Sequence, residues 1–293
     1  MTTSTTTEPT TRTIEVPGAV LTYDVRRNES STEPPLFLIG SPMGAAGFVS
    51  LAGNFPDRTI ITYDPRGAER SIKEDPTTPN TAEEQADDLH RIISEVGGPV
   101  DLFASSGGAV NALALVAKHP DDVRTLVAHE PPCASVLPDS ENAKAAVRAI
   151  SDSYQRGGFG HGMAHFMAIT GHRGEFPEDI GQQPAPDPAM FGMPTEDDGN
   201  RTDVMLAQNI IGTTHYEPDF DALKAASTRI VLVAGAESEG EMANRGAYCV
   251  AEKLGTDVVV FPSHHGGFLG GEYGWPGDPD AFAAKLRQVL SEA

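Results

Sequence analysis

Short apolar runs alternate with amphipathic segments along most of this chain, and this alternation restricts its fold more than any other feature. Continuous apolar runs bounded by Gly, Pro or Asp are typical of strands buried on both faces of a parallel sheet. The runs occupy residues 36–39, 59–63, 100–104, 123–129, 229–234 and 257–261. The segments that we expect to be helices occupy residues 81–95, 107–118, 240–254 and 278–292. Strands that alternate with helices predict an α/β fold, with a mainly parallel sheet flanked by helices.

The alternation stops between residues 134 and 218. This segment has no buried-strand run, and its helical patterns cover residues 140–155, 159–170 and 200–212. We therefore expect one catalytic core with an inserted, mainly helical cap, rather than two independent domains. The predicted core is residues 13–133 and 219–293, the predicted cap is residues 134–218, and residues 1–12 are expected to form a disordered tail.

The charge and the cysteine content restrict the partners and the compartment. The chain has 42 acidic and 21 basic residues, a net charge of −21, which argues against nucleic acid and anionic membranes as partners. No apolar run approaches the ~18 residues of a membrane-spanning helix, and the N-terminus lacks the apolar segment of a secretory signal. Cys133 and Cys249 are expected to be reduced thiols. We predict a cytoplasmic protein that can form a homo-oligomer.

The segment DLFASSGGAVN places a serine in a tight turn between a predicted strand and a predicted helix. A nucleophile on such a turn needs small residues two positions before it and two positions after it. Ser106 meets this requirement, because Ala104 and Gly108 flank it. Ser105 does not, because Phe103 would occupy the earlier position. We predict that Ser106 is a catalytic nucleophile.

Two adjacent histidines, His264 and His265, follow the last predicted strand. A histidine directly before glycine on a short loop can reach the nucleophile, and Gly266 follows His265. The imidazole pKa of about 6.5 suits proton exchange with a serine hydroxyl near neutral pH. We predict that His265 is the general base and that His264 is a solvated loop residue.

A third residue should orient the base and stabilise its charged form. The loop after the strand at 229–234 often supplies such an acid, but here Ser238 stands where a carboxylate is often found, between Glu237 and Glu239. Glu130 directly follows the strand next to the one that leads to Ser106. We favour Glu130 as the acid and keep Glu237 and Glu239 as alternatives.

An oxyanion hole needs two backbone N–H groups that point at the developing negative charge. Gly107 follows the nucleophile and is expected to supply one of them. The loop after the first central strand is expected to supply the other. In that loop Pro42 has no N–H, so Met43 is the first choice and Ser41 the second.

Together these motifs resemble serine hydrolases of the α/β-hydrolase superfamily over essentially the whole chain after the tail. The matching segments are residues 39–44 (IGSPMG), 63–67 (YDPRG), 104–108 (ASSGG), 129–132 (HEPP) and 265–268 (HGGF). The chain is similar to actinobacterial members with cap domains, and its Ser–Glu–His order resembles zearalenone lactonases. It departs from the common pattern in lacking a His-Gly pair before the oxyanion loop and an Asp late in the chain. The resemblance implies the α/β-hydrolase fold and the triad.

From these residues we predict an enzyme that cleaves a carboxylic ester or lactone of low polarity through an acyl-enzyme, with no cofactor. The alternatives are a carbon–carbon bond hydrolase or cofactor-free haloperoxidase-like enzyme, and a non-catalytic ligand-binding protein on the same fold. Apolar cap residues are expected to line the substrate site, namely Met163, Phe166, Met190 and Phe191.

Two further signals are assigned no role in the chemistry. His161 and His165 share a predicted helical face, but no other ligand cluster is nearby, so no metal site is predicted. Arg66 in the DPRG segment is expected to anchor a loop rather than to bind substrate.

Overall fold

A computed structural model describes residues 8–292 and contains a nine-stranded sheet. The strands are β1 (Thr10–Val16), β2 (Ala19–Arg26), β3 (Leu36–Ile39), β4 (Ile60–Asp64), β5 (Ile72–Lys73), β6 (Val100–Ser105), β7 (Val123–His129), β8 (Arg229–Gly235) and β9 (Val259–Phe261). Their order is β1-β2-β4-β3-β6-β7-β8-β9, and β5 pairs with β2. From β4 to β9 along this order all neighbours are parallel, whereas β2 is antiparallel to β1, β4 and β5.

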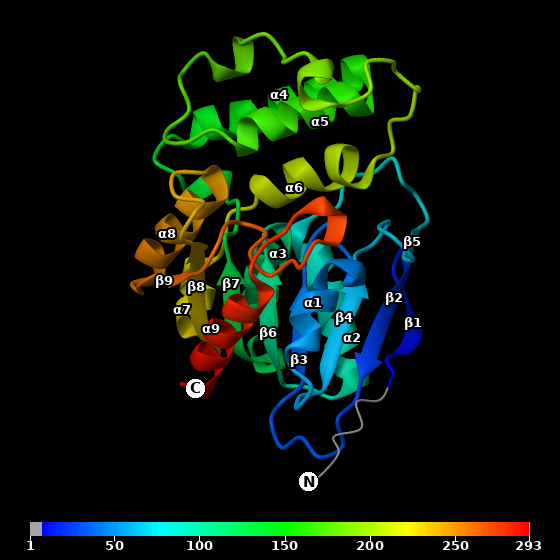
Figure 1. The fold of residues 1–293 in the computed structure, drawn as a ribbon, viewed down its shortest axis with the longest axis vertical. Helices are drawn as coiled ribbons and strands as arrows, with labels where there is room; N and C mark the ends of the chain where they lie inside the picture. The colour runs from blue at the N-terminus through cyan, green and yellow to red at the C-terminus, as the bar shows by residue number, and fades with distance from the viewer. Residues whose placement is uncertain (1–7, 293) are drawn as a thin grey trace.

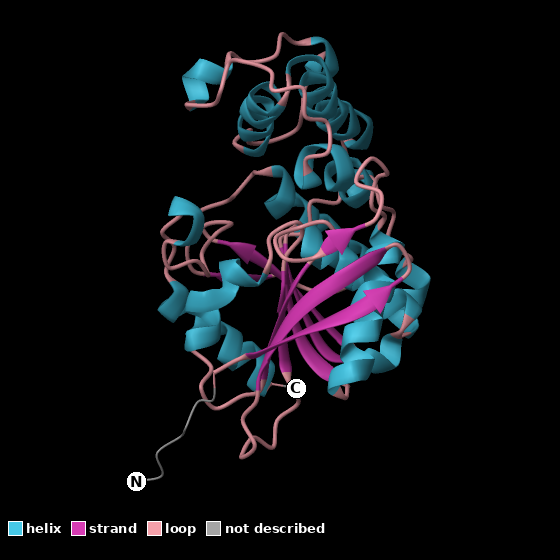
Figure 2. Ribbon diagram, turned by 90° about the vertical axis from the view of Figure 1, so that its right-hand side faces the viewer, coloured by secondary structure: helices cyan, strands magenta, loops and turns pink. Residues whose placement is uncertain are grey.

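Helices cover both faces of this sheet (Figures 1 and 2). They are α1 (Val49–Gly53), α2 (Ala82–Val96), α3 (Gly107–Lys118), α7 (Phe220–Ala225), α8 (Met242–Leu254) and α9 (Pro279–Ser291). Helix α2 begins where the Thr81 hydroxyl accepts a hydrogen bond from the Glu84 amide at 3.1 Å. The predicted strands and helices of the core are therefore present, within a few residues of the expected bounds.

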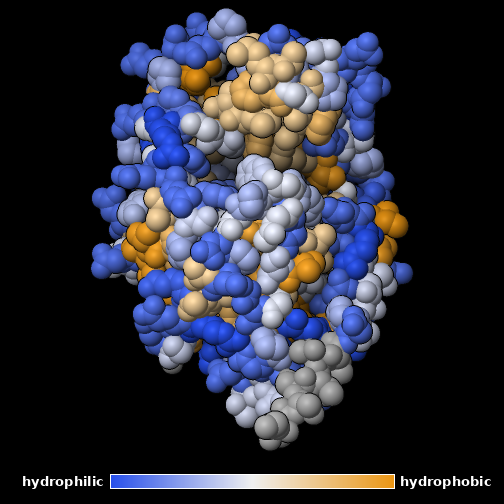
Figure 3. Space-filling model, in the orientation of Figure 1, coloured by the Kyte–Doolittle hydropathy of each residue, from blue (hydrophilic) through white to orange (hydrophobic). Residues whose placement is uncertain are grey.

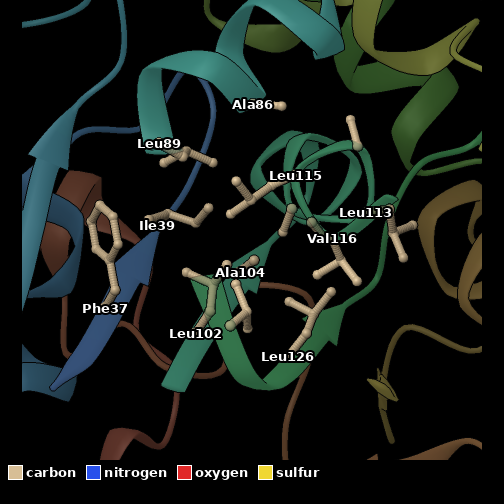
Figure 4. Packing of buried hydrophobic residues seen from close by; sticks show 14 of the residues in the cluster. Phe37, Ile39, Ala86, Leu89, Leu102, Ala104, Leu113, Leu115, Val116 and Leu126 are labelled. Atoms are coloured by element: carbon tan, nitrogen blue, oxygen red, sulfur yellow. The ribbon is translucent and has the colours of Figure 1, made fainter. Parts of the chain in front are cut away.

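Alternate side chains of the central strands enter two separate cores, as the strand period of two requires. Phe37, Ile39, Leu102 and Ala104 pack with α2 and α3 in one core, which Figure 4 shows from close by. Leu36, Leu38 and Phe103 of the same strands pack with α1 and α9 in the other core. Because both faces are buried, the central strands read as continuous apolar runs in the sequence.

Between β7 and β8 the chain forms a mainly helical insertion, whose apolar cluster also includes Met242 of α8. It contains α4 (Ser140–Gly157), α5 (Phe159–Thr170), a π-helix (Val204–Asn209) and α6 (Ile210–Thr214), with 3-10 turns between them. In Figure 1 the insertion lies beyond one end of the strands, on the side where β6 leads into α3. None of the helices within residues 8–292 is long and apolar enough to cross a membrane.

The N-terminal boundary of the core differs from the prediction. The predicted tail covered residues 1–12, but Thr10, Thr11 and Arg12 belong to β1, where Thr10 pairs with Val25 of β2. That part of the prediction is wrong, because pairing with a strand that follows in the chain outweighs the polar composition of the segment. Residues 1–7 lie outside the described residues. Both cysteines are free thiols, as predicted.

Candidate active site

Ser106 occupies the sharp turn between β6 and α3, with φ 56° and ψ −126°. A positive φ is uncommon for any residue except glycine and marks a strained backbone, which often accompanies function. The two following glycines are required by close packing. A Cβ on Gly107 would lie 2.6 Å from the carbonyl oxygen of Ser41, and a Cβ on Gly108 would lie 2.8 Å from the Cα of Gly40.

Strand β7 ends beside this turn, and Glu130 directly follows it. The register pairs Ser105 with His129, so Ser106 and Glu130 leave neighbouring parallel strands side by side. The Ser106 N–H donates to the carbonyl oxygen of His129 at 2.9 Å. Glu130 also has a positive φ, of 48°. Two consecutive strand ends therefore present strained, non-glycine residues at one edge of the sheet.

The carboxylate of Glu130 is fully buried and holds several hydrogen bonds. Its Oε1 accepts bonds from the Gly235 N–H at 2.8 Å, from the Ser238 hydroxyl and from Asn244 Nδ2 at 3.3 Å. Its Oε2 lies 2.5 Å from Nδ1 of His265. Burial raises the pKa of Glu130, but the hydrogen bond from His265, the charge of that imidazole and the Ser238 hydroxyl together hold that pKa well below its usual value. Glu130 is therefore ionised.

His265 lies on the loop after β9, with 27% of its side chain exposed, whereas Glu130 is sealed from solvent. Burial lowers the pKa of His265, but the hydrogen bond to Glu130 and the charges of Glu130 and Glu241 outweigh burial and raise it. One ring edge is thus fixed by a buried carboxylate while part of the ring stays accessible. A general base that works at a solvent-connected site needs this arrangement.

The other predicted acids and the other histidine point elsewhere. Glu237 and Glu239 are exposed, and their backbone carbonyls accept hydrogen bonds from the guanidinium of Arg173. His264 Nε2 lies 3.1 Å from the carbonyl oxygen of Pro276, and its Nδ1 accepts the Gly266 N–H at 3.0 Å. The structure thus brings Glu130, rather than the two later acids, to His265.

The predicted oxyanion donors lie around the same turn. Gly107 is the first residue of α3, and the amide at that position has no acceptor within its own helix. The loop of residues 40–44 packs against it through the Ser41 carbonyl. The Met43 side chain packs back onto Gly40 and the core beneath, with its Cε 3.0 Å from where a Gly40 Cβ would stand. The Ser41 hydroxyl donates to Gln85 Oε1 at 3.0 Å.

Three buried residues of the site were not predicted to take part in it: His129, Ser238 and Asn244. Ser238 and Asn244 hold Glu130, and the His129 ring stacks on the His265 ring with centroids 5.6 Å apart. His129 directly precedes Glu130, so a polar residue at the end of an apolar strand was the available signal. No comparable feature of the local sequence indicates the hydrogen bonds that Ser238 and Asn244 make to Glu130.

The apolar residues expected from the insertion do not share one environment. Met163 and Phe166 of α5 are half-buried and pack against the core of the insertion, and Phe191 is half-buried. Met190 is 81% exposed, and its role at the substrate site stays a prediction. It lies in a short turn, Pro188–Phe191, at the surface of the insertion. Figure 3 shows apolar residues gathered on one surface of the insertion.

Within residues 8–292 one group of His and Asp side chains has ligand atoms within 4.8 Å of one another, namely His90, His119 and Asp122. The two rings are stacked face to face with centroids 3.9 Å apart, so their in-plane lone pairs do not converge. Nδ1 of His90 already bonds Asp122 at 2.7 Å. His161 and His165 also have separate partners, the Gly157 carbonyl and the Ser153 hydroxyl. Neither arrangement is suited to hold a metal.

A cavity of about 510 Å³ lies elsewhere, beside β2 and β4. Two of its acids are already neutralised, because Arg70 bonds Asp64 at 2.6 Å and Asp24 at 2.7 Å. Its lining includes neither Ser106 nor His265.

Comparison with known proteins supports the fold described above. A family model described as the alpha/beta hydrolase fold matches residues 36–180. An uncharacterized hydrolase of Bacillus subtilis, YraK, is 29% identical over 263 residues, which cover 87% of this chain and 89% of that protein. A thermophilic esterase from Thermogutta terrifontis has a TM-score of 0.65 at 20% identity, covering 98% and 99% of the two chains. Carboxylesterase CesB of Bacillus subtilis has a TM-score of 0.65 at 14% identity, covering 98% and 93%. The predicted fold class is confirmed.

Proposed function

We propose that this chain, which has the α/β-hydrolase fold, is a serine hydrolase that cleaves a carboxylic ester or lactone. The observation that carries the proposal is the contact of 2.5 Å between His265 Nδ1 and Oε2 of Glu130, whose carboxylate is fully buried. Glu130 directly follows β7, which pairs with β6, and β6 leads to Ser106, the strained residue at the strand-to-helix turn. Structural neighbours named as esterases, and a relative named as a hydrolase, support the same reaction class.

In the proposed reaction Ser106 Oγ attacks the carbonyl carbon of the substrate while His265 Nε2 accepts the hydroxyl proton. Glu130 keeps the proton on Nδ1 and stabilises the imidazolium that forms. The C–O bond to the alcohol then breaks, and His265 delivers its proton to the leaving oxygen. His265 then takes a proton from water, which attacks the acyl carbonyl carbon. The bond to Ser106 Oγ breaks, and His265 returns the proton to that oxygen as the acid leaves.

The negative oxygen of each tetrahedral intermediate needs donors that are already in place. We assign this role to the backbone N–H groups of Gly107 and Met43. The close packing of Gly107 on the Ser41 carbonyl supports the assignment, because it holds the 40–44 loop against the start of α3. The hydrogen bond between Ser41 and Gln85 anchors the same loop to α2.

We further propose that the insertion acts as a cap over the site and favours substrates of low polarity. Helix α6 supports this, because a Cβ on Gly107 would lie 3.1 Å from Cγ2 of Thr213. The insertion therefore reaches the residue that we assign to the oxyanion hole. The half-buried Met163 and Phe166 supply adaptable apolar surface on the same insertion.

The test combines covalent labelling with turnover. A fluorophosphonate probe should label wild-type protein at Ser106, as identified by peptide mass spectrometry, and should not label Ser106→Ala. A panel of p-nitrophenyl esters and lactones should be turned over by wild type and not by Ser106→Ala. Ser50→Ala, a partly exposed serine on α1, is the matched control and should keep both activities. Absence of labelling in wild type, or labelling at another residue, would sink the proposal.

A further inference from the structure

A second buried pair lies directly behind Ser106 and Glu130. Ser105 and His129, the residues that precede them, face each other in the β6–β7 register, and Ser105 Oγ lies 3.0 Å from His129 Nδ1. Both side chains are almost completely buried, at 2% and 0% exposure. The pair therefore joins the ends of the two strands that carry the nucleophile and the acid.

Aromatic rings contact the His129 ring on several sides. It stacks on the His265 ring at 5.6 Å with 23° between the planes. Phe268 and Phe282 contact it edge to face, at 6.1 and 5.4 Å, and Phe103 stacks on it at 6.0 Å. An imidazole held in this way restricts where the His265 ring can turn.

The two nitrogens of His129 have different surroundings. Nδ1 faces the Ser105 hydroxyl, whereas Nε2 has no hydrogen-bond partner among residues 8–292. Nε2 lies 4.0 Å from Glu130 Oε2, the oxygen that also contacts His265. A proton on Nε2 points an N–H dipole towards this carboxylate and leaves Nδ1 to accept from Ser105. The opposite tautomer would direct a lone pair at the negative oxygen.

We propose that His129 is a positioning residue, a neutral imidazole with its proton on Nε2 that holds the Glu130 carboxylate and the His265 ring in place. Ser105 fixes the tautomer by donating its hydroxyl to Nδ1. The catalytic meaning of this role rests on the proposed function of Ser106, Glu130 and His265. The tautomer of His129 and its effect on the pKa of His265 can be measured without turnover.

His129 stays neutral over the range in which a serine hydrolase works. Burial lowers its pKa to about 4; the Glu130 carboxylate acts in the opposite direction and the charge of His265 in the same direction. A second imidazolium would compete with His265 for Glu130, and burial prevents this. The charges that act on His265 are those of ionised Glu130 and of Glu241, and His129 adds none because it is neutral.

The N–H dipole of His129 stabilises the carboxylate and so weakens its hold on the His265 proton. Removing the dipole should raise the pKa of His265, by about 0.5. A residue that only fills space would not produce this shift. The pKa of His265 therefore separates a positioning role from a packing role.

The experiment is a pH titration by NMR of the full-length protein labelled with ¹⁵N-histidine, with signals assigned from His129→Phe and His265→Asn. We expect His129 to show the Nε2–H tautomer and to stay neutral from pH 5 to 8. In His129→Phe the His265 midpoint should move up by about 0.5, and in His129→Gln, whose amide restores an N–H donor, it should move back towards wild type. An Nδ1–H tautomer, protonation of His129 in that range, or an unchanged midpoint in His129→Phe would each overturn the inference.

Phe282→Leu is the matched control, because Phe282 contacts the same ring but offers no polar group. It should lower the stability without moving the His265 midpoint. If His129→Phe does not fold, Ser105→Ala provides the test, since loss of the donor should populate the Nδ1–H tautomer of His129. Because the titration needs no substrate, absence of ester turnover sinks the proposed function alone. Normal turnover with an unchanged midpoint sinks the inference alone.

Discussion

Glu130 and His265 are 135 positions apart in the chain, yet Oε2 of one lies 2.5 Å from Nδ1 of the other. The carboxylate is sealed from solvent, and the backbone of Gly235 and the side chains of Ser238 and Asn244 hold its second oxygen. A buried carboxylate with this many donors is both ionised and fixed in orientation. Its contact with Nδ1 therefore fixes the orientation of the His265 ring.

Replacing the acid with its amide should remove most of the activity. Glu130→Gln keeps the volume but not the charge, so the His265 imidazolium loses its stabilisation and its tautomer is no longer fixed. We expect kcat on a p-nitrophenyl ester to fall by about 10³ to 10⁴-fold. The controls Glu237→Gln and Glu239→Gln alter exposed side chains and should stay near wild type. Near-normal turnover in Glu130→Gln, with loss in either control, would assign the acid to the later loop.

The pH dependence of the reaction should report the raised pKa of His265. The base must be neutral to accept the Ser106 proton, so kcat/KM should fall tenfold per pH unit below the pKa of His265. Because Glu130 more than offsets burial, this limb should lie above the ordinary value of about 6.5. In Glu130→Gln the limb of any residual activity should move down. A wild-type limb below about pH 6 would contradict the assignment.

The same pair should make the stability depend on pH in two directions. Glu130 has a lowered pKa, so its contribution is present above its unfolded value of about 4.3 and is lost as the pH falls. His265 has a raised pKa, so its contribution is complete below about 6.5 and is lost as the pH rises through the folded value. The unfolding free energy of wild type relative to Glu130→Gln should therefore be largest between about pH 4.5 and 6.5. Urea unfolding at several pH values measures it, and a difference that is flat with pH would refute the prediction.

Adding one methyl group at the serine turn should damage the site. In Gly108→Ala the new Cβ would lie 2.8 Å from the Gly40 Cα, where only backbone surrounds it, so the 40–44 loop must move. We expect a loss of about 1 to 3 kcal/mol in unfolding free energy, together with loss of ester turnover. Gly53→Ala on α1 is the control, because its Cβ meets nothing within 4 Å. Equal stability and activity in the two variants would show that the turn has more room than described.

Arg66 is buried and makes two hydrogen bonds of 2.7 Å with Asp88 of α2, which supports the prediction that it anchors a loop. Removing one member of a buried ion pair leaves the other charge uncompensated. Arg66→Met should therefore cost about 3 to 5 kcal/mol in urea unfolding. The double variant Arg66→Met, Asp88→Leu should recover much of this loss. If the single and double variants are equally destabilised, the pair does not account for the effect.

Much of the architecture could be predicted because its signals are local. An apolar run such as Leu36–Ile39 records burial on both faces, and the helix after Thr81 begins at a capping residue. Strand β5, with two residues, and helix α1, with five, carry too few residues for a periodic pattern. The start of β1 was also missed, because it depends on pairing with β2 rather than on its own composition.

The candidate site divides in the same way. The serine turn could be predicted from local signals, because Ala104 and Gly108 are the small residues that such a turn requires. The sequence also restricted the base to two neighbouring histidines and the acid to three glutamates. The contact between Glu130 and His265, and the position of His129 next to both of them, could not be predicted in this way. These contacts depend on strand order and register, which bring together residues from separate loops. Local composition does not encode such contacts.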